Sequence, residues 1–168
     1  MSLELLLSRR SVRSYTDEPV ADEAVQKLLA AAMSAPSAGN QQPWHFIVIR
    51  ERETLGQVPA IHPHAQMVPQ AQAAIVVCAD EALEKHKGYW VQDCSAATQN
   101  LLLAAHFQAL GAVWVGIYPR EERVVSFRKL LSIPENIIPF ALVAIGHPNE
   151  TKAPAERYNP SRIHYGRW

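Results

Sequence analysis

The sequence lacks the features of a membrane protein, an exported protein or a disulfide-stabilised scaffold. It contains two cysteines, Cys78 and Cys94, which are too few for a disulfide framework and are expected to be reduced thiols in the core. No stretch reaches about 18 apolar residues, so no transmembrane helix is expected. The pair Arg9-Arg10 is not a twin-arginine export signal, because polar residues follow it where a hydrophobic segment would stand. We therefore expect a cytoplasmic protein with no membrane partner.

An excess of one charge is also missing, since 16 basic residues balance 16 acidic ones. A zero net charge argues against a nucleic-acid-binding protein, although a local cationic pocket stays compatible with it. The sequence has no Gly-x-Gly-x-x-Gly motif and no Gly-Lys-Ser/Thr phosphate loop. The segment His62-Pro63-His64 has no spaced Cys or His partner. We therefore expect it to be a loop near the mouth of a site, with no metal bound.

What the sequence does contain is the apolar content of a soluble core, with 48% hydrophobic and 19% charged residues. Runs rich in apolar and β-branched residues predict strands at 44–49, 73–78, 112–117 and 140–145, with Pro139 at the start of the last. Apolar periodicity and capping residues predict helices at 3–9 (capped by Ser2), 22–33 (capped by Asp22), 51–55, 89–110 and 120–131. This alternation implies an α/β or mixed α+β sheet covered by helices.

The helix expected at 89–110 is apolar on almost every face, and Gly111 is its natural C-terminal stop. Such a helix lies between a sheet and a second surface, which in a domain this small can be a second subunit. Residues 148–168 are polar and carry Tyr158, Tyr165 and Trp168. We expect this tail to dock on another surface.

The first candidate site is Arg9-Arg10-Ser11-Val12-Arg13. Guanidinium groups match the oxygens of a phosphate in a forked geometry, and a serine hydroxyl adds a further donor. In an extended segment Arg9, Ser11 and Arg13 share one face. A solvated basic face at the end of a helix explains the same residues without a ligand.

The second candidate site is the loop Pro36-Ser37-Ala38-Gly39-Asn40-Gln41-Gln42-Pro43-Trp44. It offers one hydroxyl and three side-chain amides, and each amide is both a donor and an acceptor. Such a set suits the edge of a heterocycle with alternating donors and acceptors. An ordinary helix-to-strand connection is the alternative interpretation.

Taken together and in this order, the arginine-serine cluster and the Pro-Ser-x-x-Asn-x-Gln-Pro-Trp loop resemble the nitroreductase family of FMN-dependent oxidoreductases. The run Val113-Trp114-Val115-Gly116-Ile117 lies where that family has a strand passing the flavin ring, and Gly146-His147-Pro148 follows the last core strand. The resemblance spans nearly the whole chain. It implies an α+β, three-layer α/β/α fold with a mainly antiparallel sheet, formed by residues 1–168 as a single domain. It also implies an intertwined homodimer that exchanges the C-terminal arms, residues 148–168, and holds two flavins at its interface.

The resemblance implies a phosphate-binding set at the two ends of the chain. Arg9 and Ser11, with Arg10 beside them, look like ligands of the FMN phosphate and ribityl chain. Arg157 and Arg162 look like phosphate ligands from the C-terminal arm. An FMN phosphate brings about −1.5 to −2 charges, which two or three arginines would balance.

The resemblance also implies contacts to the flavin ring. Arg13 looks like the cation near the pyrimidine edge. Val115 and Gly116 resemble the pair whose backbone approaches the hydride-accepting nitrogen. Many family members have an acidic residue where Val115 stands, so this chain lacks that carboxylate. The residues that look like contacts to the flavin of the other protomer, the last as a support, are Pro36, Ser37, Ala38, Asn40 and Gln42.

The function implied by the resemblance is an NAD(P)H-dependent FMN oxidoreductase with ping-pong kinetics. NADH or NADPH delivers a hydride and leaves, and a small organic acceptor, nitroaromatic or quinone-like, then enters the same cleft. No catalytic side chain is named, because the flavin carries the chemistry. One alternative is specialised flavin chemistry, either reductive dehalogenation or flavin breakdown, for which only segments 57–70 and 85–89 offer short lids. Another alternative is a flavin-binding or flavin-storing protein without useful turnover.

Overall fold

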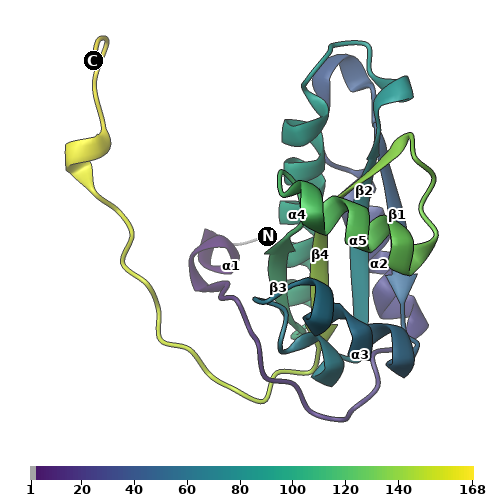
Figure 1. Ribbon diagram of the computed structural model, residues 1–168. Coiled ribbons are helices and arrows are strands. Elements are labelled where there is room, and N and C mark those ends of the chain that lie inside the picture. Colours follow the sequence, from purple (N-terminus) through teal and green to yellow (C-terminus); the bar gives the residue numbers. More distant parts are fainter. Residues whose placement is uncertain (1–2) are drawn as a thin grey trace.

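A four-stranded antiparallel sheet forms the centre of the computed structural model, which describes residues 3–168 (Figure 1). The strands lie in the order β1-β2-β4-β3, and each neighbouring pair is antiparallel. The prediction of four strands in a mainly antiparallel sheet is confirmed, and β1 and β3 are the edge strands. The strand bounds are β1 Trp44–Ile49, β2 Ala73–Asp80, β3 Gly111–Gly116 and β4 Ile137–Gly146.

Helices cover both faces of the sheet, which confirms the three-layer α/β/α fold. α2 (Asp22–Met33) and α4 (Trp90–Phe107) pack on one face, and α3 (Arg52–Ile61) and α5 (Glu121–Leu131) pack on the other. Within residues 3–168, no helix is long and apolar enough to cross a membrane. Ser2, expected to cap the first helix, lies outside the described residues. The remaining elements are α1 Leu3–Ser8 and the 3₁₀ turns η1 Ala38–Asn40, η2 Val68–Gln70, η3 Glu81–Leu83 and η4 Pro160–Arg162.

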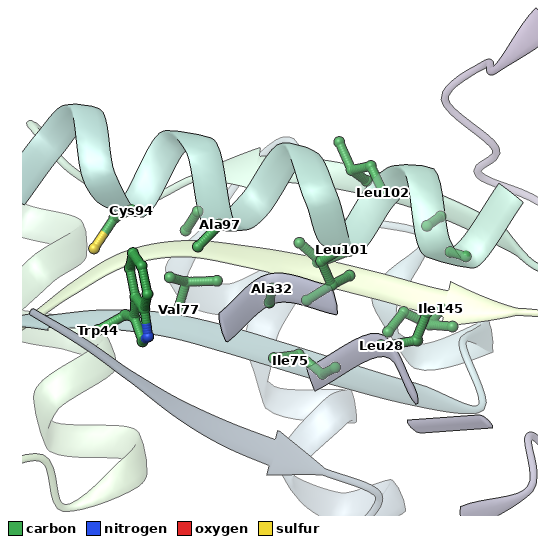
Figure 2. Close-up of a cluster of buried hydrophobic side chains, with 14 of the residues drawn as sticks. Leu28, Ala32, Trp44, Ile75, Val77, Cys94, Ala97, Leu101, Leu102 and Ile145 are labelled. Carbon is green, nitrogen blue, oxygen red and sulfur yellow. The ribbon is translucent and has the colours of Figure 1, made fainter. Parts of the chain in front are cut away.

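β2 joins the two hydrophobic cores, because adjacent side chains of a strand point to opposite faces of the sheet. Ile75 and Val77 belong to the core under α2 and α4, where Leu101 of α4 lies in the same cluster (Figure 2). Val76 and Cys78 belong to the core under α3 and α5. A fully buried aliphatic side chain contributes about 1.5–3 kcal/mol to folding, so β2 holds both helix layers in place.

The two cysteines are core residues, as predicted. Both are buried and free. Burial raises the pKa of both thiols, to about 12 for Cys78. They are therefore protonated and unreactive at neutral pH.

Two helices end at different residues from those predicted. The short helix expected to begin at 51–55 continues as α3 through Pro59 to Ile61, into a segment, 57–70, expected to be a loop with broken helical turns. Val58 is fully buried against the sheet, and burial of this face outweighs the backbone bond that a proline cannot make. α4 ends at Phe107, and Ala109, with a φ of 57°, makes the left-handed turn that was expected of Gly111. Gly111 is instead the first residue of β3.

Two further expectations, about the start of a helix and the start of a strand, are wrong. Asp22 does not cap α2 with its side chain, because its carboxylate pairs with the Arg50 guanidinium at 2.8 Å. Pro139 is not at the start of its strand, since β4 begins at Ile137. The register between β2 and β4 shifts between Val77 and Cys78. This irregularity lies opposite Pro139 and accommodates its missing N–H.

The N-terminal segment and the start of the C-terminal arm run antiparallel to each other at one end of the sheet. The Thr16 N–H donates to the His147 carbonyl, and the Asn149 N–H donates to the Ser14 carbonyl, both at 2.9 Å. The Lys152 ammonium donates to the Ser11 carbonyl at 2.7 Å. Beyond these contacts the arm leaves the body of the chain (Figure 1), and residues 151–168 are exposed.

Candidate functional site

A cavity of about 560 Å³ lies along the edge strand β3, within the size range of small-molecule sites. It brings together three residues that the sequence analysis assigned to a flavin ring, namely Arg13, Val115 and Gly116. The other lining residues are His62, His64, Gln66, Met67, Val113, Trp114, Tyr118, Pro119, Arg120 and Arg123.

The outer edge of β3 presents backbone groups to this cavity. The Ala112 carbonyl accepts from the Val12 N–H at 3.0 Å, outside the sheet. The Gly116 carbonyl also points outward, since it accepts from His62 Nε2 at 2.8 Å and from Arg123 at 3.0 Å. Backbone groups alternate sides along a strand, so the N–H groups of Trp114 and Gly116 face outward as well. Val115 is buried, and its backbone groups face β4.

His62 holds the end of β3 in place. It is 1% exposed, and burial is the main cause that lowers its pKa, with the nearby Arg123 as a further cause. Its Nδ1 accepts from the His64 N–H at 3.2 Å, so Nε2 carries the proton that is donated to the Gly116 carbonyl. His62 is therefore a neutral side chain that fixes the position of the Gly116 carbonyl. Among the residues that the structure describes, no group of three His, Cys, Asp or Glu side chains could hold a metal.

A cluster of guanidinium groups lies where the N-terminal segment meets the C-terminal arm. The pKa of Arg9 is lowered first by burial and then by the positive charges of Arg157 and Arg10. Within residues 3–168, Arg9 has no carboxylate within ion-pair distance. A partly buried cation among like charges is stabilised by an anion. This cluster therefore suits a phosphate.

Arg10 and Arg162 are less suited to a phosphate at this cluster than Arg9 and Arg157. The Arg10 guanidinium donates to the carbonyls of Leu7 and Arg9 at 2.7 Å and of Ala153 at 3.0 Å. Arg10 therefore ties α1 to the arm. Arg162 lies in η4, which is exposed and stands away from the body (Figure 1). A single chain thus brings Arg157, and not Arg162, to Arg9.

The amide loop has a backbone conformation that few sequences adopt. Gly39, Asn40 and Gln42 have positive φ values of 53°, 54° and 48°. A Cβ on Gly39 would lie 2.6 Å from the ring of the exposed His86, so a larger residue would strain the backbone and displace this ring. The Gln42 amide donates to Asn40 Oδ1 at 3.1 Å. Pro36, Asn40 and Gln42 are exposed at the surface.

Gln41 and Asp93 hold this loop from below, and sequence reasoning missed both roles. Gln41 is 6% exposed and Asp93 is 4% exposed. The Asp93 carboxylate accepts from the Ala38 N–H at 2.9 Å and from the Gln41 amide at 2.6 Å. The Gln41 carbonyl oxygen accepts from the backbone N–H groups of Lys85 and His86. No local sequence signal marks this network, because Asp93 lies on α4, far along the chain.

The amide loop and the cavity lie at opposite edges of the sheet within one chain. The loop leads into Trp44 at the start of β1, whereas the cavity follows β3. Three strand spacings of about 4.8 Å separate these edges by roughly 14 Å. One chain therefore does not place Asn40 beside Gly116, and a pocket that contains both needs a second copy.

Comparison with known proteins decides the family. The family model described as "Nitroreductase family" matches residues 6–147. This chain belongs to the nitroreductase family. A relative from Archaeoglobus fulgidus, provisionally named NADH dehydrogenase/NAD(P)H nitroreductase, is 52% identical over 170 residues, which cover 99% of this chain and 98% of the relative.

Solved structures of the nitroreductase family agree with this assignment. A Parabacteroides distasonis protein with the same provisional name has a TM-score of 0.95 at 42% identity, over 99% of this chain and 98% of that one. A provisionally named nitroreductase from Desulfovibrio desulfuricans, solved in complex with FMN, has a TM-score of 0.85 at 34% identity. The alignment with it covers 99% of this chain and 96% of that chain.

Two glycines of β3 in this nitroreductase-family chain differ in the space around them, so we expect different effects from their substitution. A Cβ on Gly111 would lie 2.6 Å from Val12 Cγ1, whereas a Cβ on Gly116 meets nothing closer than 4.0 Å. We expect Gly111→Ala to lower the free energy of unfolding by about 1–3 kcal/mol through overpacking. We expect Gly116→Ala to leave it unchanged and to weaken flavin binding about tenfold, since a methyl group beside the edge N–H costs roughly 1.4 kcal/mol of contact. Urea unfolding and flavin titration of both variants measure this, and an unfolded Gly116→Ala variant would contradict it.

Proposed function

We propose that this nitroreductase-family protein is an FMN-dependent oxidoreductase that oxidises NADH or NADPH and reduces a small organic acceptor, nitroaromatic or quinone-like. The observation that carries the proposal is the outward-facing N–H of Gly116 in the wall of a cavity with cationic side chains. Relatives support it, because they bear the names NAD(P)H nitroreductase and FMN reductase, and one solved relative holds FMN.

The residues present suit the phosphate and the ring of FMN. Arg9 and Arg157, which form no ion pair within residues 3–168, suit the phosphate, and Ser11 follows Arg9 in the same segment. Arg13 lines the cavity that would hold the ring and places a positive charge where the ring gains negative charge on reduction. Glycine at 116 leaves open space for a ring against the strand edge. Bound FMN supplies the ability to take up a hydride and to pass electrons on.

The protein contributes position and electrostatics. His62 and Arg123 hold the Gly116 carbonyl, which keeps the Gly116 N–H aimed into the cavity as a hydrogen-bond donor to the ring. Because His62 is buried and its pKa is lowered, it keeps this contact without taking up a proton near neutral pH. The buried Val115 and Val113 give the inner cavity wall an apolar surface that excludes water.

We also propose a ping-pong order of substrates. Support for this order comes from the cavity of about 560 Å³ beside β3, which the reductant and the acceptor would occupy in turn. The two segments expected to be short lids are held in place. In segment 57–70, residues 57–61 belong to α3 and Val68–Gln70 form η2. In segment 85–89, the Lys85 and His86 N–H groups donate to Gln41. Held segments favour an open cleft that admits varied acceptors over the specialised alternatives.

The proposed assembly is a homodimer with the arms, residues 148–168, packed on the partner. Tyr158, Tyr165 and Trp168 are at least 80% exposed, and an apolar groove of about 580 Å³ lies between α1, α2 and α4. Phe107 of this groove is 72% exposed. Surfaces of this kind mark interfaces between subunits. A second copy would also bring an amide loop to each cavity.

The purified protein is expected to be yellow, and anaerobic NADH or NADPH is expected to bleach its flavin absorbance within seconds. Addition of a quinone should then restore the colour. Stopped-flow absorbance measures both half-reactions separately. A protein that binds FMN but is not bleached within minutes would be a storage protein and would contradict the proposed activity. A protein that does not change the fluorescence of added FMN would contradict the cofactor.

A further inference from the structure

The cavity along β3 is lined by arginines in addition to Arg13. Arg13, Arg120 and Arg123 all line it, and none of the lining residues is an aspartate or glutamate. Among residues 3–168, none of these three arginines forms an ion pair. Val115 contributes an apolar side chain to the same wall. A ligand in this cavity therefore meets three guanidinium groups and no lining carboxylate; the nearest acidic residues along the chain, Glu121 and Glu122, lie outside the lining.

The three arginines lie at different ends of β3. Arg13 follows Val12, which is bonded to Ala112 at the start of β3. Arg120 and Arg123 come after the end of β3, and Arg123 donates to the Gly116 carbonyl. If Arg13 faces the ring and Arg9 with Arg157 faces the phosphate, Arg120 and Arg123 have no anion. These two arginines then border the space past Gly116, where a second substrate would lie.

We propose that Arg120 and Arg123 form a subsite for an anionic group, a carboxylate or a phosphate, on the molecule that reacts with the flavin. The inference rests on the proposed function and adds the charge class of the substrate. Arg120 has no side-chain hydrogen bond within the described part of the chain, so its whole guanidinium fork is available. Arg123 uses one nitrogen on Gly116 and keeps its other donors. Guanidinium forks bind carboxylate and phosphate in a bidentate geometry.

Two kinds of molecule carry such an anion. One is an acceptor with an aromatic carboxylate, and the other is the reductant, whose dinucleotide carries phosphates. Both present the same chemistry to Arg120. Separate measurement of the two half-reactions tells them apart.

The first test is equilibrium binding to the oxidised, FMN-loaded protein, followed by the change in flavin absorbance. Benzoate and benzamide are the probes, because they have the same shape and differ in charge. We expect the wild type to bind benzoate more tightly, and Arg120→Gln to weaken benzoate about tenfold, the usual effect of losing one charge-assisted bond. Benzamide binding should change less than twofold. Arg120→Lys should retain most of the affinity for benzoate.

Lys129→Gln is the matched control, because it removes the same charge from an exposed residue of α5 that does not line the cavity. It should leave both probes unchanged. If the wild type binds benzoate and benzamide equally and Arg120→Gln changes neither, the anion is not on the acceptor. It is then either on the reductant, or the subsite does not exist. The rate at which NADH bleaches the flavin decides between these two outcomes. A tenfold slower reductive half-reaction in Arg120→Gln supports a phosphate of the dinucleotide as the anion, and an unchanged rate overturns the proposal.

Steady-state kinetics with a charged and an uncharged acceptor test whether the anion is on the acceptor. With 4-nitrobenzoate and 4-nitrobenzamide, Arg120→Gln should lower kcat/KM about tenfold for the charged acceptor alone. If NADH bleaches the wild type, probe charge has no effect, and Arg120→Gln is reduced as fast as the wild type, the proposed function stands and the subsite is refuted. A wild type that binds benzoate through Arg120 but is not bleached keeps the subsite and refutes the proposed activity.

Discussion

When Arg9→Ala and Asn40→Ala subunits are combined in one hybrid dimer, we expect one flavin site per dimer to regain full affinity. Alone, Arg9→Ala loses a charge-assisted contact of about 2 kcal/mol, which is roughly a 30-fold weaker affinity for FMN. Asn40→Ala loses an amide contact and strains a residue with a φ of 54°, for about tenfold weaker binding.

The recovery follows from the position of the two motifs at opposite edges of the sheet. If each site takes Arg9 from one subunit and Asn40 from the other, the hybrid has one site with both defects and one site with neither. Two affinity tags isolate the hybrid, and absorbance gives the number of flavins per dimer. At a free FMN concentration about tenfold above the wild-type Kd, the intact site fills and the doubly defective site does not.

The reciprocal hybrid provides the control. A subunit with both substitutions, paired with a wild-type subunit, has one defect in each shared site and should regain no full-affinity site. A site built within one chain gives the reverse pattern in the two hybrids. Recovery in the second hybrid and not in the first, or a wild type that is monomeric in solution, would overturn the shared site.

The second large effect concerns the buried pair Asp93 and Gln41. In Asp93→Asn, the introduced NH₂ group replaces one of the two carboxylate oxygens. It then faces either the Gln41 amide donor or, after a flip of the side chain, the Ala38 N–H, so one buried donor loses its acceptor. We expect the free energy of unfolding to fall by about 2–3 kcal/mol. In Gln41→Glu, two carboxylates meet in a buried site, and we expect a loss of similar size. Urea unfolding measures both.

The double variant Asp93→Asn/Gln41→Glu exchanges the two groups and restores every bond. The carboxylate introduced at position 41 would accept from the new amide at position 93 and from the Lys85 and His86 N–H groups. The carbonyl oxygen of that new amide would accept from the Ala38 N–H. We expect the stability of the double variant to return to within about 1 kcal/mol of the wild type, with a large coupling energy between the two sites.

Flavin affinity should follow the same pattern as stability in these variants, since the network sets the position of the amide loop. Flavin titration of the two single variants and the double variant measures it. Additive losses in the double variant would show that the pair does not act as a unit.

Local sequence patterns were enough for most elements of the fold. The apolar runs of β1 and β2 predicted strands in nearly their observed positions, because β-branched and aromatic residues fit a pleated, buried surface. The patterns failed where a non-local contact outweighed a local signal. Pro59 stays inside α3 because Val58 is buried against the sheet. The sequence pattern predicts a helix stop at Gly111, yet its missing Cβ makes room for Val12.

Some residues of the candidate site could also be predicted from local sequence, and others could not. The arginine cluster and the amide loop are contiguous in sequence, and their donor types alone indicated an anion and a heterocycle. His62, Arg120 and Arg123 carry no such signal. They belong to the site because the fold places them around the end of β3. Asp93 is found for a similar reason, since only the packing of α4 brings it beneath the loop.

The amino-acid sequence by itself determined the family and the layered fold, through motifs in a characteristic order along the chain, and it marked two candidate ligand-binding motifs, because each of these is a contiguous run of residues. Only the tertiary structure decided how these parts meet. It set Arg157 and not Arg162 beside Arg9, aimed Gly116 outward through the pairing of β3 and β4, and put the amide loop on the opposite edge of the sheet. Strand order and pairing arise because the sheet buries two hydrophobic cores at once. The free energy of that burial depends on residues from the whole chain, so no single stretch of sequence encodes it.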